Sequence, residues 1–158
     1  MKIVSLFVVR HGHSNFEASS DFQRTLNFQG LNAAIKTAKF ISETVKKYGL
    51  SVDECICSAA VRTQQTADTI CNYLNVKKIN SYQQLYATVS GAWLDIIEKT
   101  SSKCLILVGH NPTMSQLNSL FSGENHYMSP ADCGYAEIEI SKEGVIAPAL
   151  KTEYFKND

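Results

Sequence analysis

Short apolar runs alternate along this chain with stretches of helical spacing. Two runs, IVSLFVV at 3–9 and CLILV at 104–108, are nearly continuous in apolar or β-branched residues, and the shorter ECICS at 54–58 has an apolar centre. Runs of this length predict strands that are buried on both faces of a sheet. Between the runs lie stretches in which apolar residues recur at helical spacing, which predicts amphipathic helices between the strands.

The predicted helices have recognisable ends. The first begins near Asn27, a good N-cap residue, and ends at Gly49, a good C-cap residue. We expect Ser58 to cap the second helix. In the last helix we expect Asn111 to be the N-cap, with Pro112 in the first turn.

The remaining elements have weaker patterns. VKKIN at 76–80 predicts a short strand, and residues 90–99 predict a short helix. YAEIEIS at 135–141 alternates between apolar and acidic residues, which indicates a half-exposed strand near the sheet edge, and residues 145–155 are expected to add another. The alternation of strands and helices predicts an α/β protein. We expect a three-layer sandwich with a mostly parallel central sheet, helices on both faces and an antiparallel edge strand.

Composition and charge narrow the classes of function. The chain has 158 residues, which suits one domain over residues 1–158, and its 15 Lys and Arg are balanced by 15 Asp and Glu. Zero net charge gives no electrostatic reason to expect binding to nucleic acid or to an anionic membrane. No segment reaches the about 18 apolar residues of a membrane span. The apolar N-terminal run has no signal-peptide cleavage pattern, so we expect a cytoplasmic protein.

The five cysteines, at 55, 57, 71, 104 and 133, are an odd number, and three of them lie inside apolar runs. We expect reduced, packed thiols, as is usual in the cytoplasm. A metal or redox pair formed by Cys55 and Cys57 is the alternative.

Cationic and titratable side chains follow three of the predicted parallel strands. Arg10 and His11 come directly after the first strand, Arg62 lies in the first turn of the helix after the second, and His110 follows CLILV. Because the carboxyl ends of parallel strands meet at one edge of a sheet, we expect these groups to lie close together at a ligand site. Residues 10–27 have no clear period, and a loop of that length is often functional.

Phosphate chemistry is what this set of side chains favours. Arg10 and Arg62 offer the charged forks that suit phosphate oxygens, and helix N-termini add backbone donors. Gly12 has no side chain, so the backbone there can come close to a ligand. A histidine among cations tends to stay neutral, and a neutral imidazole is a nucleophile. His11 is therefore a candidate to attack phosphorus and carry the phosphoryl group.

These segments resemble the motifs of the histidine phosphatase superfamily, also called phosphoglycerate-mutase-like. VVRHGHS is similar to the R-H-G signature, and RTLNFQG is similar to the stretch that opens the family's first helix. CSAAVRTQQTA is similar to S-x-A-x-R-x-x-Q-T-A, and VGHNP to the segment of the family's second histidine. Together, and in the family's order, they cover most of residues 1–120.

The resemblance implies specific roles. His11 would be the phospho-accepting nucleophile, and Arg10, Arg62 and His110 would form the phosphate pocket, with no metal and no cofactor. Arg24 is expected to reach the substrate from the loop. The short chain resembles the small phosphohistidine phosphatases of the SixA type, which lack the helical insertion that larger members place over the site. The implied partner is a phosphohistidine-bearing protein, such as a histidine phosphotransfer protein, with a small phosphate ester as the runner-up.

One part of the family pattern is missing. Many members have a Glu as proton donor after the second helix, but SYQQLYATVSGAWL at 81–94 contains no carboxylate. Glu17 also stands where mutases tend to have Asn. These differences disfavour release of an alkoxide. They matter less for phosphohistidine, whose imidazole leaving group is far less basic, and they leave His13, Glu17 and His126 as candidate proton donors.

Of three other interpretations, a zinc site and a non-catalytic binding module stay open, and a cysteine phosphatase does not. His11 and His13 with Cys55 and Cys57 could supply four zinc ligands. A cysteine phosphatase would need a C-x₅-R spacing, and neither Cys55 nor Cys57 has it relative to Arg62. The same scaffold could also be a non-catalytic phosphate- or phosphoprotein-binding module, although two histidines at the site favour turnover over binding alone.

Overall fold

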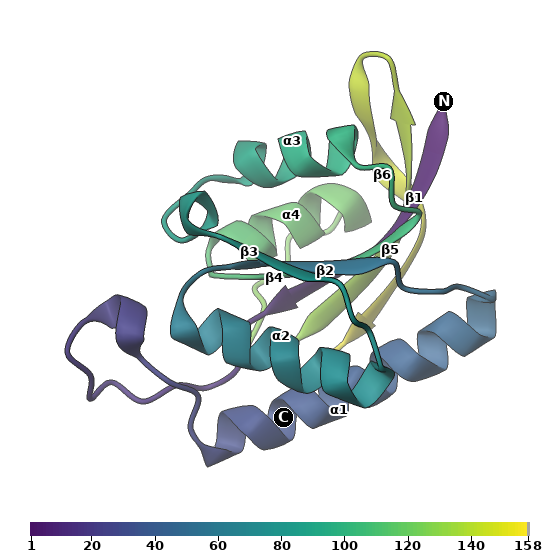
Figure 1. Ribbon diagram of the computed structural model, residues 1–158. Helices are drawn as coiled ribbons and strands as arrows, with labels where there is room; N and C mark the ends of the chain where they lie inside the picture. The colour runs from purple at the N-terminus through teal and green to yellow at the C-terminus, as the bar shows by residue number, and fades with distance from the viewer. Residues whose placement is uncertain (158) are drawn as a thin grey trace.

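A six-stranded sheet in the order β3-β2-β4-β1-β5-β6 forms the centre of the computed structural model, which describes residues 1–157 (Figure 1). The strands are β1 (Lys2–Arg10), β2 (Glu54–Ser58), β3 (Ile79–Tyr82), β4 (Cys104–Gly109), β5 (Cys133–Ser141) and β6 (Gly144–Phe155). Strands β3, β2, β4 and β1 pair in parallel, whereas β5 pairs antiparallel with both β1 and β6. The predicted α/β class with a mostly parallel sheet is confirmed. β5, which we expected near the edge, lies second from it because β6 pairs with its outer side.

Helices cover both faces of the sheet, as predicted. They are α1 (Phe28–Tyr48), α2 (Val61–Leu74), α3 (Ser90–Lys99) and α4 (Thr113–Ser122), with short 3₁₀ turns η1 (Asp21–Gln23) and η2 (Gln83–Leu85). In Figure 1, α1 and α2 lie below the sheet and α3 and α4 above it. None of the helices in residues 1–157 has the length and apolar character that a membrane crossing needs.

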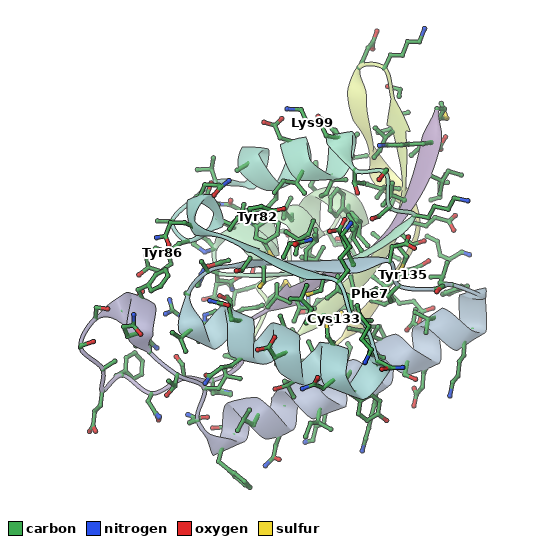
Figure 2. The ribbon with its side chains drawn as sticks, viewed as in Figure 1. Phe7, Tyr82, Tyr86, Lys99, Cys133 and Tyr135 are labelled. Carbon is green, nitrogen blue, oxygen red and sulfur yellow. The ribbon has the colours of Figure 1, made fainter. Side chains whose placement is uncertain are left out.

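A separate apolar core lies on each face of the sheet. Trp93 and Leu117 belong to the core under α3 and α4. Phe7, Cys133 and Tyr135 belong to the core that α1 and α2 cover, and Figure 2 shows them between the sheet and these helices. The two cores fix the helices against the sheet and so position the loops at the strand ends.

The ends of α1 are as predicted. The Oδ1 atom of Asn27 accepts a hydrogen bond from the Gly30 amide at 2.8 Å, which satisfies a backbone donor of the first turn. Gly49 has a φ of 64°, the left-handed conformation that glycine adopts without strain.

Two other predicted caps lie further from their helices than the sequence suggested. The cap of α2 is Ala60, and Ser58 supports it from two residues upstream, since its Oγ accepts a hydrogen bond from the Ala60 amide at 3.2 Å. Pro112 is the cap of α4 and not part of its first turn, while Asn111 Oδ1 accepts from the Ser115 amide at 3.1 Å. In both helices the polar side chain still meets a backbone donor near the start, but the helix begins later than expected.

The cysteines are free and buried, as predicted. Cys55 and Cys57 lie in the core between the sheet and helices α1 and α2. Across residues 1–157, no group of three or more His, Cys, Asp or Glu side chains is arranged to hold a metal ion. The four-ligand set considered for zinc is therefore not assembled.

Candidate active site

The register of the sheet brings the two predicted histidines together. Arg10, at the end of β1, pairs with Gly109, at the end of β4, so His11 and His110 leave neighbouring strands at the same level. Their imidazole rings meet edge to face with 5.3 Å between centroids. The expected cluster at the carboxyl ends of the parallel strands therefore contains both histidines.

His11 is held as a neutral imidazole with a defined tautomer. Its Nδ1 lies 2.7 Å from the Gly12 carbonyl oxygen, and its Nε2 lies 3.3 Å from the Nε of Arg62. A carbonyl only accepts and a guanidinium only donates, so the proton is on Nδ1 and the lone pair is on Nε2. Burial is the main cause that lowers the pKa of His11 to about 3, and the charges of nearby Arg62 and Arg10 contribute. Nε2 therefore has the lone pair that a nucleophile needs near pH 7.

Arg62 connects the two histidines. It lies at the start of α2, and its side chain is only 7% exposed. Its Nε donates to His11 Nε2, and its Nη2 lies 3.4 Å from Nδ1 of His110. The guanidinium thus fixes a positive charge beside the His11 lone pair, where the oxygens of a transferring phosphoryl group need it.

His110 has the opposite tautomer. Its Nδ1 faces the guanidinium of Arg62 and must accept, so its proton is on Nε2, which donates to Ser58 Oγ at 2.8 Å. Burial, followed by the positive charge of Arg62, lowers the pKa of His110 to about 4. Both rings are therefore neutral near pH 7, and the arginines supply the positive charge of the site.

The guanidinium of Arg10 has one donor that no atom of the described residues satisfies. Its Nη1 donates to the Met128 carbonyl oxygen at 2.9 Å, and its guanidinium lies 5.6 Å from the ring centroid of Tyr127. Its Nε is buried and has no hydrogen-bond partner within residues 1–157. A buried donor of this kind favours an anionic ligand nearby. The predicted contact between Arg10 and phosphate is consistent with this geometry and stays a prediction.

Gly12 packs too closely against helix α1 to carry a side chain. Its amide donates to Thr66 Oγ1 at 3.1 Å, which ties the loop to α2. A Cβ atom on Gly12 would lie 2.9 Å from the Gly30 carbonyl oxygen, so the close approach that we expected toward a ligand is made toward helix α1. Its contact with substrate stays a prediction.

Arg24 is held within the loop between β1 and α1. Its guanidinium donates to Ser14 Oγ at 2.6 Å, to the Asn15 carbonyl oxygen at 2.8 Å and to Asp21 Oδ1 at 3.0 Å. It also lies over the ring of Phe16, with 4.3 Å to the centroid. Arg24 is close enough for its charge to contribute to the lowered pKa of His110, and its predicted contact with substrate stays a prediction.

Asp21 is the residue at this site that the sequence analysis missed. Its carboxylate accepts hydrogen bonds from the hydroxyl of Tyr86, from Nη1 of Arg24 and from Nη2 of Arg62. The Tyr86 hydrogen bond, with those of the two arginines, holds the pKa of Asp21 well below its usual range. Its only signal in the sequence is an acidic residue in an aperiodic loop, three positions before Arg24.

The candidate proton donors are not part of this cluster. Among the hydrogen bonds and ion pairs of residues 1–157, none joins the side chain of His13, Glu17 or His126 to His11, Arg62 or His110. His126 instead packs on Tyr154, with 4.2 Å between ring centroids. Proton donation by any of the three stays a prediction.

Comparison with known proteins supports this chemistry. The family model of the histidine phosphatase superfamily (branch 1) matches residues 6–80. No curated protein sequence shows a significant match to this chain. Among solved structures, a provisionally assigned phosphohistidine phosphatase SixA from Agrobacterium tumefaciens is 25% identical, with a TM-score of 0.73, over 92% of this chain and 98% of that one.

Two further structures share the fold. The protein histidine phosphatase SixA complexed with tungstate has a TM-score of 0.72 at 17% identity, over 96% of this chain and 94% of its own. A mycobacterial glucosyl-3-phosphoglycerate phosphatase has a TM-score of 0.63 at 11% identity, over 97% of both chains. At these identities the likeness extends to the fold alone.

The family match and the site geometry agree. The matched residues include Arg10, His11 and Arg62, and the fold places His110 beside them. A neutral histidine whose free nitrogen faces a buried guanidinium is suited to accept a phosphoryl group. These findings support phosphatase activity, and over the matched residues the chain is similar to the histidine phosphatase superfamily.

Proposed function

We propose that this protein is a phosphatase that works through a covalent phosphohistidine at His11. The observation that carries the proposal is the Nε2 lone pair of His11, directed at the guanidinium of Arg62. In the first step Nε2 forms a bond to phosphorus while the bond to the leaving group breaks, and the leaving group takes up a proton. In the second step water attacks phosphorus, the N–P bond breaks, and phosphate leaves with neutral His11 restored.

The neighbouring side chains supply charge and orientation for both steps. Arg62 and Arg10 would stabilise the equatorial oxygens of the transferring phosphoryl group, as a metal ion does in other enzymes. The hydrogen bond from Nδ1 of His11 to the Gly12 carbonyl oxygen keeps the ring oriented and its tautomer fixed. His110 lies beside both the His11 ring and Arg62, where its imidazole can contact the same phosphoryl group. The mechanism therefore requires neither metal nor cofactor.

Phosphohistidine on a partner protein is the substrate that we propose. The segment 81–94 contains no carboxylate, and the hydroxyl of Tyr86 in it is bonded to Asp21. A weakly basic leaving group such as imidazole departs without a strong acid, whereas an alkoxide does not. The structural neighbour from Agrobacterium tumefaciens, provisionally assigned as a phosphohistidine phosphatase SixA, supports the same substrate class.

A trapping experiment tests the covalent step. Protein quenched during turnover of a phosphohistidine peptide should carry an acid-labile, base-stable phosphate on the peptide that contains His11. His11→Asn should lose both the trapped phosphate and turnover, because the asparagine amide can still donate to the Gly12 carbonyl oxygen but cannot attack phosphorus. Full turnover in this variant would exclude the mechanism. If the chain binds phosphopeptide but never releases phosphate, it is the binding module considered above.

A further inference from the structure

The carboxylate of Asp21 occupies the part of Arg62 that a phosphoryl group would use. Nη1 of Arg62 donates to the Asp21 carbonyl oxygen at 2.7 Å, and Nη2 donates to its Oδ2 at 3.1 Å. Nε of the same guanidinium faces His11. The backbone and side chain of Asp21 therefore contact both terminal nitrogens of the Arg62 guanidinium. These nitrogens are the donors that bind a phosphate in a bidentate geometry.

We propose that Asp21 is an internal competitor of the substrate phosphoryl group for Arg62, and that it sets the affinity of the site for phosphate. This inference rests on the proposed function only in taking Arg62 as a phosphate-binding residue. The aspartate satisfies the buried guanidinium when no phosphoryl group is bound, because an unpaired charge there would be costly. A phosphoryl dianion must displace the carboxylate from Arg62, so binding is weakened by the strength of that contact.

The exposed fractions of the two side chains indicate that Asp21, and not Arg62, would move. The Arg62 side chain is 7% exposed and is fixed by α2, whereas the Asp21 side chain is 52% exposed. Asp21 can turn its carboxylate into water, while Arg62 cannot leave the site. Arg24 is 17% exposed and donates to Asp21 through Nη1, so the same movement would leave this donor available to the incoming anion.

The loop around Asp21 is fixed at its base and held more loosely at its tip. At the base, the Asn15 amide donates to the Thr25 carbonyl oxygen at 2.9 Å. At the tip, η1 is held by the contacts of Asp21 and by the ring of Phe22, which meets Tyr86 edge to face at 5.0 Å. Figure 1 shows this loop projecting from the body of the protein beside the start of α2, and Figure 2 shows Tyr86 near its helical turn. Movement of Asp21 therefore requires opening of the tip alone.

The test compares Asp21→Asn with Asp68→Asn. Asparagine keeps the size of Asp21 and an acceptor oxygen but removes its charge. Asp68 is an exposed aspartate on α2, the helix that carries Arg62, so its variant controls for the loss of one negative charge. Isothermal titration with inorganic phosphate measures affinity without turnover.

Asp21→Asn should bind phosphate about tenfold more tightly than wild type, equivalent to about 1.4 kcal/mol. Asp68→Asn should bind as wild type does. Affinity that is unchanged or lower in Asp21→Asn would overturn the proposal, because it would mean that the carboxylate merely orients Arg62. Asp21→Ala should change affinity in the same direction, and thermal unfolding of each variant verifies that it is folded.

The outcomes separate this inference from the proposed function. If wild type binds phosphate and Asp21→Asn binds it more tightly, the competition stands even when no phosphohistidine is hydrolysed. If the enzyme hydrolyses phosphohistidine but its phosphate affinity does not respond to Asp21→Asn, the competition alone is wrong. If neither wild type nor variant binds phosphate, Arg62 is not a phosphate site and the inference falls.

Discussion

Replacement of His11 by asparagine should make the protein less sensitive to acid. The pKa of His11 is lowered from 6.5 to about 3 in the folded protein, mainly by burial. In the unfolded chain the same imidazole is exposed and takes up a proton at its ordinary value. Between these two values the unfolded state binds more protons than the folded state, so the free energy of unfolding falls as pH falls through this window. Asparagine cannot titrate, and this contribution disappears with it.

The expected size follows from the shift. At about pH 5 the solution is about 1.5 pH units below the ordinary pKa, and each unit corresponds to about 1.4 kcal/mol. Protonation of His11 in the unfolded state should therefore remove about 2 kcal/mol of stability relative to pH 7.5. The pKa of His110 is lowered to about 4 by burial and by Arg62, so this residue makes a similar contribution in both proteins.

Urea unfolding at the two pH values measures this difference. Trp93 is the single tryptophan and is 1% exposed, so its fluorescence reports on loss of the core. From about pH 7.5 to pH 5, His11→Asn should lose about 2 kcal/mol less stability than wild type. Any loss of stability caused by a cavity in the variant is the same at both pH values, so it cancels when each protein is compared with itself. His126→Asn, which removes an exposed histidine, should behave as wild type does. An equal loss in wild type and His11→Asn would refute the conclusion that burial keeps His11 neutral.

Three further outcomes are expected. Activity should survive excess chelator and be inhibited by orthovanadate, because arginines supply the positive charge; activity lost in chelator and restored by zinc or magnesium would contradict this. Phosphohistidine should exceed alkyl phosphates in kcat/KM by about 10³, or roughly 4 kcal/mol, with aryl phosphates between, and equal turnover in a kinetic panel would point to a hidden acid. Gly12→Ala should lower the free energy of unfolding by about 1–3 kcal/mol, because its Cβ would lie 2.9 Å from a backbone oxygen. Gly91→Ala, with open space around the new Cβ, should not lower it, and chemical denaturation of both variants measures the difference.

Periodicity was sufficient to predict the central strands and most helices, since β1, β4 and α1 are strongly patterned and locally determined. The half-exposed pattern of β5 correctly placed it near the edge, with residues 145–155 adding a further strand, but the full strand order depends on long-range pairing that has no local signal. Arg10, His11, Arg62 and His110 follow parallel strands, and this made the cluster of both histidines with Arg62 predictable.

Asp21 was not predictable, for a physical reason. Its role depends on residues 10–27 folding back onto α2, which is a long-range arrangement with no periodic signal. Ser58 was recognised only as a helix cap, because its second contact, to the imidazole of His110, joins residues 52 positions apart. Sequence patterns report local structure and burial, whereas these contacts arise when separate strand ends meet.

The buried Nε of Arg10 has a consequence for the stability of the whole protein. A buried donor without a partner costs about 1–3 kcal/mol, and an oxyanion that accepts from it removes this cost only in the folded state. Folding and anion occupancy are therefore thermodynamically linked. An anion present at about one hundred times its dissociation constant should add about 2.7 kcal/mol to the unfolding free energy. The melting temperature thus becomes a measure of occupancy, and a library of phosphorylated compounds can be ranked by the heat resistance that each confers, before any reaction has been observed.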